Sequence, residues 1–130
     1  RLLELMHDIC TSYRHETIHS KTFLPIAKGI LYLEHCKTHE LSIAEIAKMC
    51  NISESCFRKL FRQYAGIGPN EYRTQKLMHH AEALLREGQY TIAEISSQLG
   101  YENSTYFSKV FKTYYGLPPR EYMKQMMEDL

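Results

Sequence analysis

One stretch of the sequence places hydrogen-bonding and cationic side chains together on one face of a predicted helix. Residues 104–115 are expected to be helical, because their apolar residues recur at the spacing of a single helix face. The opposite face carries only hydroxyl and ammonium side chains: Ser104, Thr105, Ser108, Lys109 and Lys112. These groups can donate hydrogen bonds to base edges and phosphates, and no acidic residue interrupts them. Such a face is typical of a helix that enters the major groove of DNA.

The elements around this helix predict a helix-turn-helix. The residues expected to anchor it in the core are Phe107, Val110, Phe111 and Tyr114. Ile92, Ile95 and Leu99 share one face of a shorter preceding helix, and Gly100 is expected to end it. Residues 101–103 then form the turn. Tyr106 lies at the edge of the aromatic stripe, so core packing and a DNA contact both stay open for it.

The same unit occurs a second time, earlier in the chain. The tetrapeptide IAEI at 43–46 recurs at 92–95, 49 positions later. Beyond the turn the offset is 50 positions, as these pairs show: Phe57/Phe107, Lys59/Lys109, Phe61/Phe111, Tyr64/Tyr114, Gly66/Gly116, Pro69/Pro119 and Tyr72/Tyr122. Ser42 and Thr91 each precede the tetrapeptide with a glutamate three positions on, which predicts a capping box. We therefore expect two copies of one helical unit, with the same aromatic residues in both cores.

The sequence predicts an all-α chain with four segments. Residues 1–20 are expected to be a helix or linker from an upstream dimerisation or sensor region, and 21–72 the first helix-turn-helix subdomain. Residues 71–87 contain no internal Pro or Gly and predict one long connecting helix. Residues 88–130 are expected to form the second subdomain, with no further motif in its methionine-rich tail. The chain starts at Arg1 rather than Met, so we expect a segment of a longer protein.

Composition narrows the class of protein. The chain has 130 residues, 44% hydrophobic and 24% charged, which is typical of one ordinary domain or two small ones. It has no apolar run of membrane-spanning length and no secretory signal. The four cysteines lack the spacing of a zinc site or disulfide scaffold and are expected to be reduced thiols in the cytoplasm. The net charge of +1 is by itself weak support for nucleic-acid binding.

Catalytic and metal-binding patterns are not complete. The histidine pairs His15/His19 and His35/His39 have helical spacing, but a metal site needs three or four converging ligands. The sequence has no phosphate-binding glycine loop, HExxH motif or nucleophile elbow. We expect no enzyme activity, no catalytic residues, no cofactor and no metal site.

The second unit, IAEI…GY…YFSKVFKTYYGLPPREY, resembles the DNA-binding domain of the AraC/XylS family, and the resemblance covers about residues 25–122. It implies two homeodomain-like helix-turn-helix subdomains in tandem, joined by a long central helix. It also implies a cytoplasmic bacterial transcription regulator, commonly an activator, that binds double-stranded DNA. RNA polymerase is a further expected partner, and a homodimer would form through an upstream region absent from this sequence.

The resemblance also assigns site residues by position. Base-reading residues would be Ser55, Arg58, Lys59, Ser104, Thr105, Ser108 and Lys109, and phosphate-binding residues would be Arg62, Arg73 and Lys112. Both recognition helices would enter successive major-groove segments of an asymmetric site, about 34 Å apart. Glu54 departs from this cationic pattern, since its carboxylate could repel phosphate or accept from cytosine N4.

A second class of function fits the same architecture. A helical protein-interaction domain could keep both units and lose DNA binding. Its exposed faces would be expected to carry glutamate or large apolar residues. The predicted faces at 57–64 and 104–115 carry no acidic residue, which favours DNA.

Overall fold

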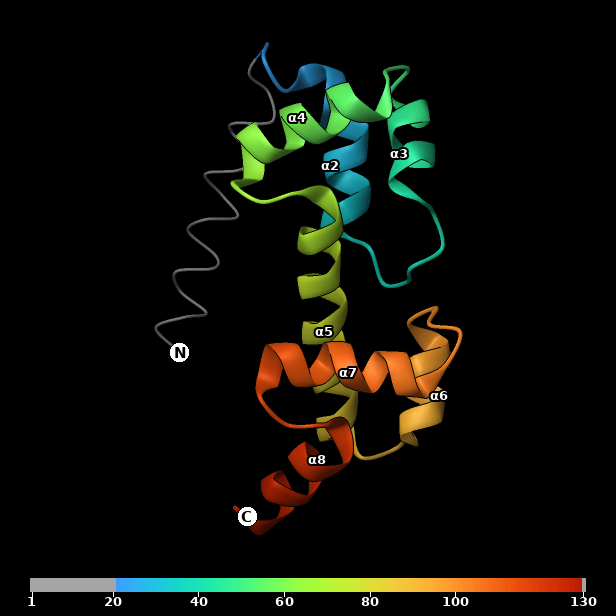
Figure 1. Ribbon diagram of the computed structural model, residues 1–130, viewed down its shortest axis with the longest axis vertical. Helices are drawn as coiled ribbons and strands as arrows, with labels where there is room; N and C mark the ends of the chain where they lie inside the picture. The colour runs from blue at the N-terminus through green and yellow to red at the C-terminus, as the bar shows by residue number, and fades with distance from the viewer. Residues whose placement is uncertain (1–20, 130) are drawn as a thin grey trace. The chain divides into compact units, whose positions relative to one another are not determined.

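The computed structural model describes residues 21–129, and this part of the chain is helical with no strand (Figure 1). The elements are η1 (Leu24–Ile26), α2 (Ala27–Glu34), α3 (Ile43–Met49), α4 (Glu54–Ala65), α5 (Pro69–Glu87), α6 (Ile92–Gln98), α7 (Ser104–Tyr115) and α8 (Pro119–Glu128). The all-α prediction is confirmed. The helix expected within residues 1–20 lies outside the described residues. None of the helices in 21–129 is both long and apolar enough to span a bilayer.

The described chain forms two compact units. The first comprises residues 21–35 and 41–72, and the second comprises 36–40 and 73–129. Helix α5 therefore begins in the first unit, while most of it belongs to the second. The sequence predicts a connecting helix at 71–87 that is separate from both subdomains. In the structure, Leu77, Met78 and Ala81 of α5 are buried in the core of the second unit. This grouping arises because the apolar stripe of α5 packs within that core.

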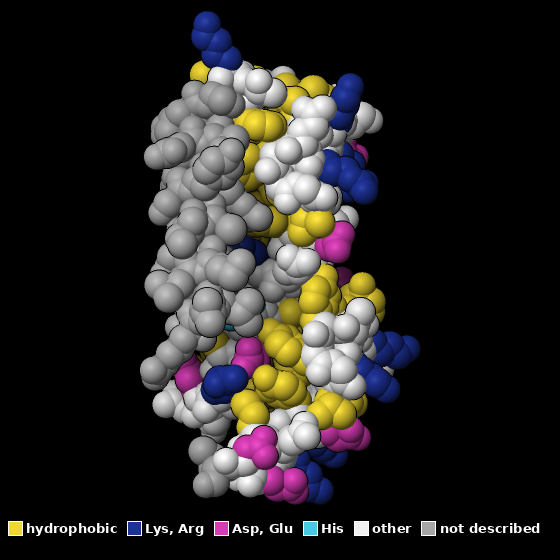
Figure 2. All heavy atoms as spheres, turned by 90° about the vertical axis from the view of Figure 1, so that its left-hand side faces the viewer, with side chains coloured by type: hydrophobic (Ala, Val, Ile, Leu, Met, Phe, Trp, Pro, Cys, Tyr) yellow, Lys and Arg dark blue, Asp and Glu magenta, His cyan; other side chains and the backbone are white. Residues whose placement is uncertain are grey.

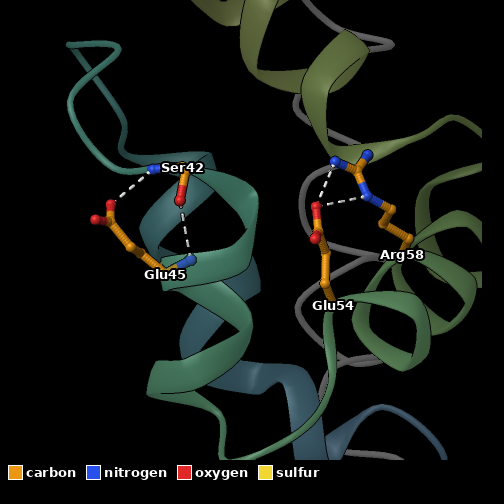
Figure 3. Close-up of polar contacts among 4 residues, drawn as sticks. All are labelled: Ser42, Glu45, Glu54 and Arg58. Carbon is orange, nitrogen blue, oxygen red and sulfur yellow. Dashed lines mark hydrogen bonds and ion pairs between the residues drawn. The ribbon is translucent and has the colours of Figure 1, made fainter.

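The first unit is organised around α2, α3 and α4. Its buried core residues are Ile26, Ile30, Leu33, Ile43, Ile46, Ala47, Phe57, Phe61 and Tyr72. Helix α3 begins with the predicted capping box: the Ser42 N–H donates to Glu45 Oε2 at 2.8 Å, and the Glu45 N–H donates to Ser42 Oγ at 3.1 Å (Figure 3). Ser53 caps α4 by accepting from the Cys56 N–H at 3.2 Å. These caps set where the two helices of the motif begin.

The second unit repeats this arrangement with α5, α6, α7 and α8. Its buried core residues are Leu77, Met78, Ala81, Leu84, Leu85, Ile95, Leu99, Phe107 and Phe111. Thr91 caps α6 by accepting from the Glu94 N–H at 3.1 Å, and Asn103 caps α7 by accepting from the Tyr106 N–H at 2.7 Å. The predicted start and end of the helix at 104–115 are confirmed.

The prediction that Tyr114 of α7 lies in the core is wrong. Tyr114 is 38% exposed, whereas its neighbour Tyr115 packs against Phe111 with ring centroids 4.6 Å apart. The Tyr115 hydroxyl also donates to the Met78 carbonyl oxygen at 3.2 Å. The buried ridge continues from Phe107 and Phe111 in steps of four, which brings Tyr115 rather than Tyr114 against α5.

Helix α8 is an element that the sequence patterns did not predict. Pro119 stands in its first turn, where the missing N–H breaks no intrahelical hydrogen bond. Tyr122 on α8 meets Phe111 edge-on at 5.4 Å, and its hydroxyl donates to Glu82 Oε1 at 3.1 Å. The helix therefore helps to close the core below α7.

The turn between α6 and α7 contains a glycine that a neighbouring segment approaches closely. Gly100 has a φ of 85°, and a Cβ there would lie 3.0 Å from the backbone nitrogen of His39. The His39 N–H donates to the Leu99 carbonyl oxygen at 2.9 Å. Gly116 has a similar φ of 80°, but a Cβ there would meet no atom within 4 Å.

This contrast predicts different effects for two matched substitutions. Gly116→Ala should lower the free energy of unfolding by about 1–2 kcal/mol, the penalty of a left-handed alanine. Gly100→Ala should lower it further, because the methyl group also displaces the segment at residues 36–40. Urea denaturation of both variants measures the difference. Equal losses would mean that this segment moves aside without a penalty.

Candidate nucleic-acid interface

Helix α7 brings its predicted site residues together. Ser104, Thr105, Ser108, Lys109 and Lys112, with Pro118, line one pocket of about 340 Å³ on the surface of the second unit. The side chains on the other face of α7, Phe107 and Phe111, are fully buried and hold the helix in place. The pocket is thus lined by hydroxyl groups and two ammonium groups on a helix that cannot rotate without exposing its aromatics.

The charge of this pocket is positive. Helix α7 has no acidic residue in its first turn, and within residues 21–129 neither Lys109 nor Lys112 forms an ion pair. The backbone N–H groups at the start of a helix add partial positive charge. An anionic partner with hydrogen-bond acceptors fits this combination, and phosphates and base edges both supply them.

Two tyrosines flank the start of α7. Tyr106 is 60% exposed, which resolves the open choice between core packing and the surface in favour of the surface. Tyr101 lies behind it, with ring centroids 5.9 Å apart. Burial, with a smaller contribution from Tyr106 and Tyr114, raises the pKa of Tyr101 to about 12, so its phenol stays neutral at ordinary pH. Hydrophobic and cationic side chains both reach the surface of this unit, as the space-filling view shows (Figure 2).

Helix α4 carries the predicted site residues of the first unit. Ser55, Arg58, Lys59 and Arg62 are exposed. Arg58 is ion-paired within its own helix: its Nε and Nη2 donate to Glu54 Oε1 at 3.2 and 2.8 Å (Figure 3). In the second copy of the repeat, Ser104 takes the position of Glu54 and Ser108 takes the position of Arg58. The two reading faces therefore differ in chemistry at these positions. The sequence places Glu54 near this face, but only the structure identifies its partner.

One predicted phosphate-binding residue does not lie at the surface. Arg73 is only 2% exposed and belongs to the second unit. Partial desolvation, with a smaller contribution from the positive charge of Arg73, lowers the pKa of the His39 imidazole. A side chain buried to this extent does not reach out to the phosphates of a DNA backbone. This burial counts against the predicted role of Arg73 in phosphate binding.

Metal-ligating side chains do not gather in the described part of the chain. Within residues 21–129 no three His, Cys, Asp or Glu side chains are placed to share an ion. The pair His15/His19 lies outside the described residues. Cys36, Cys50 and Cys56 are free thiols.

Comparisons with known proteins point to one group of regulators. A family model described as a helix-turn-helix domain matches residues 40–125. The lactose operon transcription activator of Staphylococcus xylosus is 37% identical over 67 residues, which are 52% of this chain and 24% of that protein. This chain thus spans about a quarter of that relative.

Solved structures agree in fold. The C-terminal domain of AraT, a response regulator of Geobacillus stearothermophilus, is 26% identical, with a TM-score of 0.74 over 82% of this chain and 88% of that one. The DNA-binding domain of AdpA, solved with a target DNA, is 22% identical with a TM-score of 0.70, over 78% and 91% of the two chains. The latter likeness concerns the fold alone.

Proposed function

Because this chain belongs to the AraC-type helix-turn-helix family of DNA-binding transcription regulators, we propose that α4 and α7 are its two recognition helices. The observation that carries the proposal is the pocket on α7. Five residues assigned from the sequence line it, on the face opposite the buried aromatics. Hydroxyl and ammonium donors beside one another suit acceptors at base edges and at phosphates.

Each helix contributes a different set of contacts. On α7, Lys109 donates to guanine O6 or N7, the hydroxyls of Thr105 and the two serines pair with several bases, and Lys112 binds phosphate. On α4, Arg58, Lys59 and Ser55 face bases and Arg62 faces phosphate. Since the units repeat head to tail in one chain, a single copy reads an asymmetric site with boxes about 10–10.5 base pairs apart.

A second part of the proposal concerns the role of the whole protein in transcription. The relative from Staphylococcus xylosus is named a transcription activator. We infer that the present protein also activates transcription, works in the cytoplasm and contacts RNA polymerase. A region outside this sequence supplies dimerisation, which would strengthen binding through effective concentration.

Selection from random duplex DNA tests the function directly. The chain is expected to enrich an asymmetric motif with two boxes about one helical turn apart, and its affinity should fall steeply with salt because phosphate contacts release counterions. Failure to enrich any motif at low salt would contradict DNA reading by this chain. That outcome would favour the protein-interaction alternative.

Lys109→Ala tests the base-reading role of the pocket. We expect the affinity for the selected duplex to fall by about 1–3 kcal/mol, with a relaxed preference at one guanine, if Lys109 pairs with that base. Fluorescence anisotropy with the selected duplex and a variant at that position measures both effects. Lys124→Ala is the matched control, since Lys124 is exposed on α8 and does not line the pocket. An unchanged affinity and base preference in the Lys109 variant would remove it from the interface.

A further inference from the structure

The reading helix of the first unit carries an ion pair whose equivalent is absent from the second unit. Glu54 and Arg58 stand one turn apart on α4, and their side chains are 46% and 43% exposed (Figure 3). Exposed pairs of this kind contribute little to stability. In the second unit the corresponding positions are Ser104 and Ser108, both of which line the pocket on α7. The ion pair therefore distinguishes the first reading face from the second, although the other predicted contact residues are of similar type in both.

The geometry of the pair leaves part of the guanidinium available. A guanidinium has five N–H donors in a planar fork. Glu54 Oε1 accepts from Nε and from Nη2, along one edge of that plane. Both N–H groups of Nη1 and one of Nη2 remain available. One N–H from each of these two nitrogens forms the end of the fork, which is the edge that donates to guanine O6 and N7. Contact with Glu54 is thus compatible with bidentate recognition of guanine.

We propose that Glu54 is a positioning residue that holds Arg58 for guanine, and that it makes the first unit the more stringent reader of the two. This proposal rests on the proposed DNA-binding function. A free arginine loses considerable rotamer freedom when it docks, and an arginine already held by a neighbour loses less. Glu54 thereby favours the one orientation that reads a base.

The carboxylate also acts against the wrong contact. A negative charge at the start of α4 repels phosphate, so Arg58 gains less from settling on the backbone of an unrelated sequence. Glu54 should therefore lower non-specific affinity while it raises discrimination at one base pair. The second unit, which has hydroxyl groups at these positions, lacks both effects and should tolerate more base changes.

The test compares two duplexes that differ at one position. The affinity of the whole chain is measured for its selected duplex and for the same duplex in which the guanine read by Arg58 is replaced by adenine. The ratio of the two affinities reports discrimination at this base pair. Arg58→Ala should lower the affinity ratio by about tenfold or more, the lower range for a bidentate pair. Glu54→Gln should lower the same ratio several-fold, increase affinity for unrelated DNA and steepen the salt dependence. Thermal unfolding of each variant checks that α4 is intact.

A double variant separates positioning from direct reading. If Glu54 acts through Arg58, adding Glu54→Ala to Arg58→Ala should change the base preference no further. A further loss of preference at the pairing cytosine would mean that Glu54 contacts a base itself, which would overturn the positioning role.

A transfer of the pair to α7 provides a gain of function. The double substitution Ser104→Glu with Ser108→Arg should create a new guanine preference in the second box, and Ser108→Arg alone should create a weaker one. Equal preferences in both variants, with no effect of Glu54→Gln on the first-box ratio, would refute the proposal. If the unaltered chain enriches no motif at all, the DNA-binding function itself fails, which is a distinct result.

Discussion

Phe111→Ala is expected to lower the free energy of unfolding of the second unit by about 3–5 kcal/mol, the range for removal of a fully buried aromatic. Phe111 has no exposed surface. Its ring lies 4.6 Å from that of Tyr115 and 5.4 Å from that of Tyr122, so it joins α7 to α8. Truncation would leave a cavity where these elements meet. Urea denaturation followed by circular dichroism measures the loss.

Tyr114→Ala is the matched control for this result. Tyr114 belongs to the same helix but is 38% exposed. Its truncation should lower the free energy of unfolding by much less than that of Phe111, about 1 kcal/mol or less. Comparable losses would mean that Tyr114 belongs to the core after all, contrary to its position in the structure.

Gly29→Ala is expected to destabilise the first unit by about 1–3 kcal/mol or more, the range for overpacking of a tight core. Gly29 is buried in α2, and a Cβ there would overlap Phe57 Cε2, lie 2.8 Å from Phe57 Cζ and lie 3.1 Å from Ile46 Cγ2. Neither neighbour is the free end of a flexible chain, because both side chains are fully buried. The same substitution would ordinarily favour a helix by about 1 kcal/mol, so the sign of the result is diagnostic.

Binding data add a second measurement to this prediction. Phe57 belongs to α4, so its displacement should disturb recognition of the first DNA box and leave the second box unchanged. Gly68→Ala serves as the control in the same unit, since a Cβ there would meet no atom within 4 Å. An alanine at position 29 that leaves stability unchanged would contradict the close packing of α2 on α4.

Much of the architecture was predictable because it depends on residues close together in the chain. The apolar period identified the helices of both motifs, and the short polar residues Ser42 and Thr91 marked where α3 and α6 begin. Asn51, which takes the place of Gly100 in the repeat, has the positive φ of 59° that this turn requires. The internal repeat extended these helix assignments from one unit to the other.

The tertiary structure decided the features that depend on distant contacts or on side-chain direction. Helical spacing predicted that Tyr114 faces inward, but in the structure it is Tyr115 that packs against α5. Arg73 matched a phosphate-binding position, but its side chain is only 2% exposed. The contact of Glu54 with Arg58 needed rotamers that no sequence pattern specifies. Sequence alone determined the helices of the two motifs and the residues that can donate to DNA, because period and caps are local. Helix α8, the exposure of those donors and the contacts that hold them followed from packing between helices.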